Sequence, residues 1–174
     1  HFFNENIGPY PYEQYSVIQG GDGGMEYGMC TLITANRSFE SLVGVTAHEL
    51  AHSWFQFVLA TNESKHEWMD EGLTEYYCTQ AEASIMGVDE EAVFKTSYDR
   101  YRKLALSGVE QSQTTHADRS RFNASYGVSA YTQGSIFFRQ LKHIIGAVAF
   151  YMALDDYVSL GSFKHPPPID FILW

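Results

Sequence analysis

The sequence is poor in cysteine, in positive charge and in long apolar runs. It has only two cysteines, Cys30 and Cys78, and neither has a CxxC neighbour, so a disulfide framework is excluded and free buried thiols are expected. Lys and Arg number 11 against 21 Asp and Glu, and the resulting net charge of -10 argues against a nucleic acid or an anionic membrane as a partner. No apolar run reaches the roughly 18 residues that a membrane-spanning helix needs.

Apolar and aromatic residues are plentiful, at 45% and 16% of 174 residues, so one domain with a substantial core is expected. We predict a domain over residues 1–160 and, over 161–174, the start of a following segment. The sequence opens without methionine and stops in an apolar stretch after three prolines. We therefore expect a piece of a longer protein that has neighbouring domains, and its compartment is left open.

The order of the patterns predicts an α+β fold, with a small N-terminal sheet followed by a mostly helical part. Strands are expected at 15–19 and 25–34, on either side of the loop GGDGG. Two polar connectors are expected, at 35–42 and 107–127. Helices are predicted at 43–59, 70–86, 89–107, 129–145 and 147–158. Asp70 is a plausible N-cap of its helix, and Gly87 is a plausible terminator.

The segment HELAH carries two histidines four residues apart, His48 and His52. On an α-helix such residues lie about 40° apart around the axis and about 6 Å apart along it. Both imidazoles therefore face one side and can bind one metal ion, while Glu49 flanks that ion and can take a proton from water.

A buried helix that merely contains two histidines is the simpler alternative. The motif alone is moderate evidence, because H-E-x-x-H also occurs by chance. Burying two imidazoles and a carboxylate on an otherwise apolar helix requires partners for all three, however, and a dication would satisfy them together. A catalytic zinc site needs a third protein ligand. Glu71 follows His52 after 18 residues, a spacer long enough for the chain to turn and enter a second helix. The alternative explanation for Glu71 is that the helix dipole favours acidic residues in the first turn of a helix, here at 70–71.

The pattern HExxH, 18 residues, then E resembles the gluzincin zinc peptidases, whose catalytic domain is thermolysin-like. The segment GGMEY, residues 23–27, resembles the G-x-M-E-N edge strand of their aminopeptidase branch, which includes alanyl aminopeptidases and leukotriene hydrolases. The resemblance implies that Glu26 binds the free α-amino group of a substrate; a plain loop acid is the alternative. It also implies substrate contacts from Gly23, Gly24 and Met25.

Two tyrosines downstream continue the resemblance. Tyr131 in AYTQG matches the family tyrosine that stabilises an oxyanion, and Tyr126 matches a second tyrosine five residues earlier. Without the resemblance, Tyr131 would be assigned to the core. Where many relatives carry an acid seven residues after the glutamate ligand, this chain has Cys78. Glu75 resembles the acid that thermolysin uses to support a zinc histidine; a solvated helix acid is the alternative.

The resemblance implies a zinc aminopeptidase with one Zn²⁺ on His48, His52 and Glu71, with Glu49 as general base, acting on peptides with a free N-terminus. One alternative is a related hydrolase on the same site, either an endopeptidase or an epoxide hydrolase. The other is a scaffold that binds peptides without cutting them. An intact Glu49 argues against the scaffold, because binding alone needs no general base.

Overall fold

The computed structural model describes residues 1–173 and confirms the α+β class: a three-stranded sheet near the N-terminus precedes a mostly helical body. Strand β1 (Ser16–Gln19) pairs in parallel with β3 (Cys30–Ile33), and β2 (Met25–Tyr27) pairs antiparallel with β3. The strand order β1-β3-β2 leaves β2 at the edge of the sheet. An edge strand has unpaired backbone groups available to another chain.

The predicted strand over 25–34 is in fact two strands. The chain reverses after Tyr27, through Gly28 and Met29, and Met29 has a φ of 65°. Alternating hydrophobicity continues through this turn, so periodicity alone could not place it. The reversal puts Glu26 opposite Thr31, whose hydroxyl donates to the carbonyl of Met25 at 3.0 Å.

Helix α2 (Phe39–His52) begins earlier than predicted, within the segment expected to be a polar connector. Ser38 caps it by accepting a hydrogen bond from the backbone N–H of Ser41, which is the reason why the helix starts there. A π-helical turn, η1 (Ser53–Val58), continues α2, with Trp54 and Phe55 buried.

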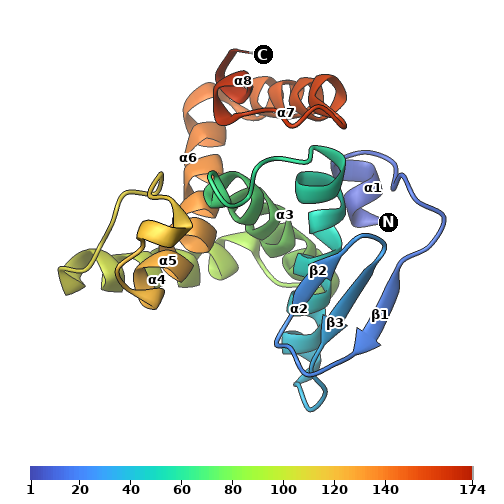
Figure 1. Ribbon diagram of the computed structural model, residues 1–174, viewed down its shortest axis with the longest axis horizontal. Helices are drawn as coiled ribbons and strands as arrows, with labels where there is room; N and C mark the ends of the chain where they lie inside the picture. The colour runs from blue at the N-terminus through green and yellow to red at the C-terminus, as the bar shows by residue number, and fades with distance from the viewer. Residues whose placement is uncertain (174) are drawn as a thin grey trace.

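Helix α3 (Glu67–Met86) forms the centre of the molecule and is buried along most of its length. Figure 1 shows the sheet and α2 on one side of α3, and helices α4 (Glu90–Ser107) and α5 (Asn123–Gly127) on the other. The αL conformation of Gly87 ends α3, as predicted. Asp70 is not its N-cap, because α3 begins at Glu67, one turn earlier.

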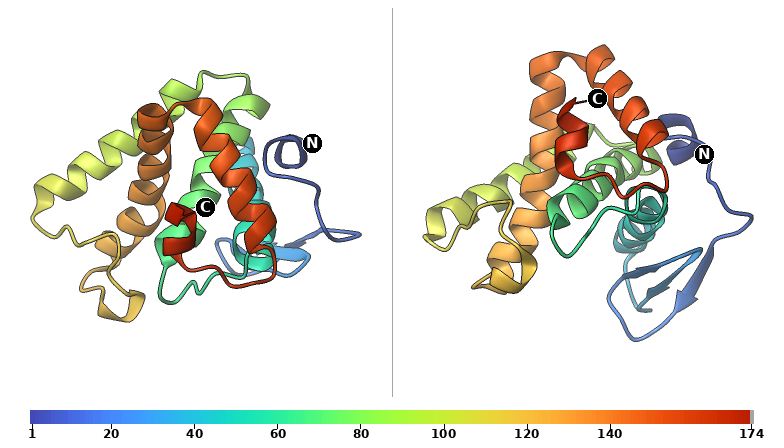
Figure 2. Two further views of the ribbon diagram at one scale, coloured as in Figure 1. Left: turned by 90° about the horizontal axis from the view of Figure 1, so that it is seen from above. Right: turned by 45° about the horizontal axis from the view of Figure 1, so that its top comes forward.

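The C-terminal helices pack across α3. The helix predicted over 129–145 consists of a π-helical turn, η3 (Val128–Gln133), and α6 (Gly134–Ile145). Helices α7 (Ala147–Gly161) and α8 (Pro168–Leu173) follow, and Figure 2 shows α7 crossing above α3, with α1 (Phe2–Asn6) beside the N-terminus. Phe171 of α8 packs edge-on against Phe138 and Tyr157.

Helices α3 and α6 approach each other closely at Gly72 and Gly134. A Cβ built on Gly72 would come within 2.8 Å of the Gly134 Cα, and one built on Gly134 within 2.7 Å of the Gly72 Cα. Two glycines therefore let the backbones meet, and this contact fixes η3 above the N-terminal half of α3. Among residues 1–173, no helix is both long and apolar enough to cross a membrane.

Candidate metal centre and active site

The two histidines of HELAH and the predicted glutamate converge on one point between α2 and α3. The Nε2 atoms of His48 and His52 are 3.3 Å apart, and Glu71 Oε2 lies 3.1 Å from the first and 3.4 Å from the second. Three ligands about 2.05 Å from one tetrahedral ion would be separated by about 3.3 Å. The spacing of the three donor atoms therefore fits a single metal ion of the size of zinc.

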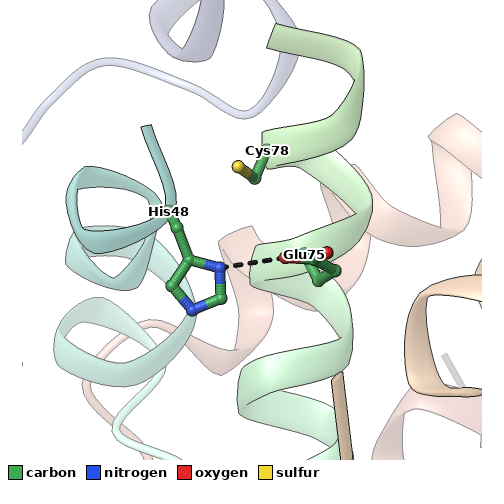
Figure 3. A group of neighbouring side chains, drawn as sticks. All are labelled: His48, Glu75 and Cys78. Atoms are coloured by element: carbon green, nitrogen blue, oxygen red, sulfur yellow. Dashed lines mark hydrogen bonds and ion pairs between the residues drawn. The ribbon is translucent and has the colours of Figure 1, made fainter. Parts of the chain in front are cut away.

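Each imidazole also bonds a carboxylate through its other nitrogen. His48 Nδ1 lies 3.2 Å from Glu75 Oε2, a contact that Figure 3 marks with a dashed line, and His52 Nδ1 lies 2.9 Å from Asp70 Oδ1. A carboxylate on Nδ1 fixes the tautomer that leaves Nε2 free for a metal. Glu75 thus takes the place that the sequence suggested for it, whereas the role of Asp70 at His52 was missed.

A signal for Asp70 was present in the sequence. Adjacent helical residues point about 100° apart, so an acid directly before Glu71 can reach the neighbouring histidine. Whether Asp70 reaches His52 depends on the distance between α2 and α3, which is set by the packing of the two helices and not by the motif.

The electrostatics of the centre favour positive charge. Burial alone would lower the pKa of His48, but hydrogen bonds to Cys78, Glu71 and Glu75 raise it well above its usual value. Burial opposes the charged form of His52 in the same way, yet Asp70 and Glu71 raise its pKa to about 10. These carboxylates create a field that a proton or a metal cation can satisfy, so the donor set suits a dication.

Cys78 lies on the same face of α3 as Glu75, and Figure 3 shows both side chains beside His48. Burial raises the pKa of the Cys78 thiol to about 12, and its Sγ donates to the carbonyl of Gly44 at 3.4 Å. The thiol is therefore neutral near pH 7. Glu75, one turn earlier, provides the carboxylate next to His48 instead.

Glu49 is 95% buried, since its relative exposure is 5%, and its Oε2 has no hydrogen-bond partner among the described residues. Burial raises the pKa of this carboxyl, which makes it a better proton acceptor once ionised. The backbone at Gly24 comes so close that a Cβ there would meet Glu49 Oε1 and Val45. The glycine loop before β2 thus forms one wall beside Glu49.

Glu26 on β2 lies at the His52 end of the centre. Its carboxylate, the His52 imidazole and the Asp70 carboxylate have atoms within 4.8 Å of one another. Burial raises the pKa of Glu26, and nearby acids raise it further. Met25 beside it is exposed, and the carbonyl of Gly23 accepts a hydrogen bond from Arg37. Glu26 is half-buried next to other carboxylates, so a cation bound there would be stabilised.

Tyr131 faces the centre and not the core. Its hydroxyl donates to Glu71 Oε1 at 2.7 Å, and its ring stacks on His48 with centroids 5.5 Å apart. The π-helical turn η3 positions this side chain. Tyr126 lines the same cleft, and burial raises the pKa of its hydroxyl to about 12.

All these groups open into one cleft of about 960 Å³. Every predicted site residue lines this cleft, and Arg37, Arg100, Glu63 and Glu82 line it as well. Nothing in the spacing of the motifs pointed to the last four residues. They come from four separate segments that only the fold brings together.

The peptidase family M1 domain model matches residues 6–171 of this sequence. The chain belongs to peptidase family M1. Aminopeptidase M1-B of Oryza sativa subsp. japonica is 27% identical over 95% of the chain, and human aminopeptidase N is 25% identical over 95%. The chain spans only 21% and 19% of the length of these two relatives.

Solved structures of the family share the fold. The M1 zinc metallopeptidase from Deinococcus radiodurans superimposes with a TM-score of 0.78 at 24% identity, covering 99% of this chain and 37% of that one. Native yeast LTA4 hydrolase gives a TM-score of 0.79 at 22% identity, covering 97% of this chain and 29% of that one. The thermolysin-like α+β expectation for this M1 domain is thereby confirmed.

Proposed function

We propose that this chain is the catalytic domain of a zinc-dependent aminopeptidase, which hydrolyses the N-terminal peptide bond of peptides. The observation that carries the proposal is the convergence of His48, His52 and Glu71 at metal-ligand spacing, beside a Glu49 oxygen that has no hydrogen-bond partner among residues 1–173. Membership of family M1 supports it. So does a variant of the Deinococcus radiodurans enzyme that was crystallised with a Tyr-Ser-Ala substrate.

One Zn²⁺ would be held by the Nε2 atoms of the two histidines and by Glu71. When bound there, zinc supplies Lewis acidity to the attacking water and to the scissile carbonyl. Glu75 and Asp70 keep the two imidazoles in the orientation that presents Nε2.

The remaining steps belong to the side chains of this chain. Glu49 Oε2 accepts a proton from the attacking water and returns it to the departing amine. The Tyr131 hydroxyl is released from Glu71 and donates to the oxygen that becomes negative in the transition state. Glu26 pairs with the α-ammonium of the substrate, so that the first peptide bond is the one placed beside Glu49. The edge strand β2 offers backbone groups to the extended peptide.

The test is release of 4-nitroaniline from leucine-4-nitroanilide by the full-length protein. Glu49→Gln should abolish turnover, because the amide cannot accept the proton. Glu40→Gln removes the same charge from the exposed first turn of α2 and should leave turnover intact. Metal analysis should find one zinc per chain in both variants. Turnover that survives in Glu49→Gln would refute the assigned base.

Blocked peptides separate this proposal from its rivals. If Glu26 binds an ammonium group, N-acetyl peptides should resist cleavage while free peptides of the same sequence are cut. Equal cleavage of both would favour an endopeptidase. A zinc-loaded protein that binds peptides and cuts none would favour the binding scaffold.

A further inference from the structure

Contacts between α2 and α3 define the two ends of the cleft, one with an acid paired to a histidine and one with an acid that has no such partner. At one end Asp70 bonds His52, near the end of α2. At the other end Glu82, near the end of α3, lies against Gly44: a Cβ built on Gly44 would meet Glu82 Oε1. The two helices therefore run antiparallel along the cleft, with the metal centre between these ends.

Glu82 has no ion-pair partner among the residues that the structure describes. It is half-buried and lines the cleft. Burial raises the pKa of its carboxyl, Glu75 raises it further and His48 partly offsets this, so the carboxylate would gain from a cation beside it. Arg37, at the same end of the cleft, is instead bonded to the carbonyl of Gly23.

The position of Glu26 gives the direction of a bound peptide. Glu26 lies beside His52 and Asp70, so a substrate whose ammonium binds there has its N-terminus at that end. The scissile bond then lies over the metal centre, and the leaving part of the peptide runs toward Gly44 and Glu82.

The distance suits the first residues of the leaving peptide. Gly44 lies one turn before His48 on α2, or about 6 Å along the helix. An extended peptide advances about 3.5 Å per residue. The Glu82 carboxylate is therefore within reach of side chains from the first or second residue after the scissile bond.

We infer that Glu82 is a specificity-determining residue, which binds a lysine or arginine side chain within the first two residues after the scissile bond. The inference rests on the proposed aminopeptidase function and adds a class of preferred substrate: peptides that carry a basic residue next to their N-terminal residue. The acid acts on the leaving side of the substrate and takes no part in the chemistry.

The experiment compares three peptide amides in the full-length protein: Leu-Lys-Lys, Leu-Gln-Gln and Leu-Glu-Glu. We expect kcat/KM for Leu-Lys-Lys to exceed that for Leu-Gln-Gln by about tenfold, the effect of one partly desolvated charge pair. Leu-Glu-Glu should be the poorest substrate. Glu82→Gln should bring the Lys-to-Gln ratio near one, and Glu82→Lys should favour the acidic peptide.

Two controls make the outcome specific. Asp156→Asn removes one negative charge from the exposed face of α7 and should keep the tenfold ratio, which separates Glu82 from the general acidity of the protein. Leucinamide has only an NH2 group beyond the scissile bond, so its kcat/KM in each variant reports on the metal centre apart from contacts on the leaving side. A ratio near one in the wild type, or an unchanged ratio in Glu82→Gln, with leucine release from leucinamide overturns this inference alone. Absence of leucine release from every substrate overturns the proposed function and this inference with it.

Discussion

Asp70 provides a sharp test of the proposed metal centre, because it contacts His52 through Nδ1 and not through Nε2, the proposed ligand atom. The change is Asp70→Asn, which keeps an oxygen that can accept from His52 Nδ1 and removes only the negative charge. Both side chains are almost fully buried, at 1% and 2% exposure, so solvent does little to screen the pair.

The size of the effect follows from the distances. The Asp70 carboxylate is 2.9 Å from His52 Nδ1, and an ion bound about 2.1 Å beyond Nε2 lies roughly 7 Å from it. Coulomb's law with an effective dielectric constant of about 20 gives roughly 5 kcal/mol as an upper limit for a unit charge and a dication at that distance. Losing an outer carboxylate weakens metal binding by about 10–100-fold in practice. We expect about tenfold for Asp70→Asn, which keeps the hydrogen bond, and about 100-fold for Asp70→Ala, which loses it.

The assay is zinc affinity by competition with a chromophoric chelator, with urea unfolding of the metal-free variants as a check on folding. Asp99→Asn, at an exposed acid of α4, is the control for a lost charge. If Asp70→Asn bound zinc as tightly as Asp99→Asn while folding normally, the carboxylate would not support the metal site and the argument from the His52 contact would be refuted.

Three further results are expected. Tyr131→Phe should lower kcat by about 10²–10³-fold with little change in KM, because the hydroxyl is needed only when the oxyanion forms. Steady-state kinetics measures both constants. A raised KM or a loss of stability with unchanged kcat would indicate a purely structural role instead. Gly72→Ala should reduce the free energy of unfolding by about 1–3 kcal/mol, since its methyl group would meet Gly134. Gly127→Ala is the control, because a Cβ at Gly127 would meet nothing within 4 Å. Equal losses of stability in urea for the two variants would contradict the close-approach argument. Chelation of zinc should lower Tm, because an ion at about a thousandfold excess over Kd stabilises the folded state by about 4 kcal/mol; a melting curve that does not respond to chelator would mean that no metal is bound at the centre.

The HExxH motif could be recognised in the sequence because it depends only on local helix geometry. Helical periodicity places His48 and His52 on one side of α2, and it does so whatever else the chain contains. The same local rules located β1, the end of α3 at Gly87 and the end of α6 at Gly146. The spacing to Glu71 and the segment around Glu26 were recognisable as a pattern, although the convergence of their side chains was not a local property.

Local rules failed where a turn or a cap overrides the pattern. The hydrophobic alternation at 25–34 continues through the reversal at Gly28 and Met29, so two strands resembled one. The start of α2 depends on the hydrogen bond that the Ser38 side chain accepts, within a stretch whose polarity suggested a loop.

The sequence by itself indicated which groups we propose to carry the chemistry: two imidazoles, a third ligand and a general base at fixed separations along two helices. Only the tertiary structure decided their partners. Asp70 reaches His52, Tyr131 reaches Glu71 and Glu82 faces the far end of the cleft because α2, α3 and η3 pack at particular distances. Those distances are set by contacts such as that between Gly72 and Gly134, which join residues far apart in the chain, and no local periodicity encodes them.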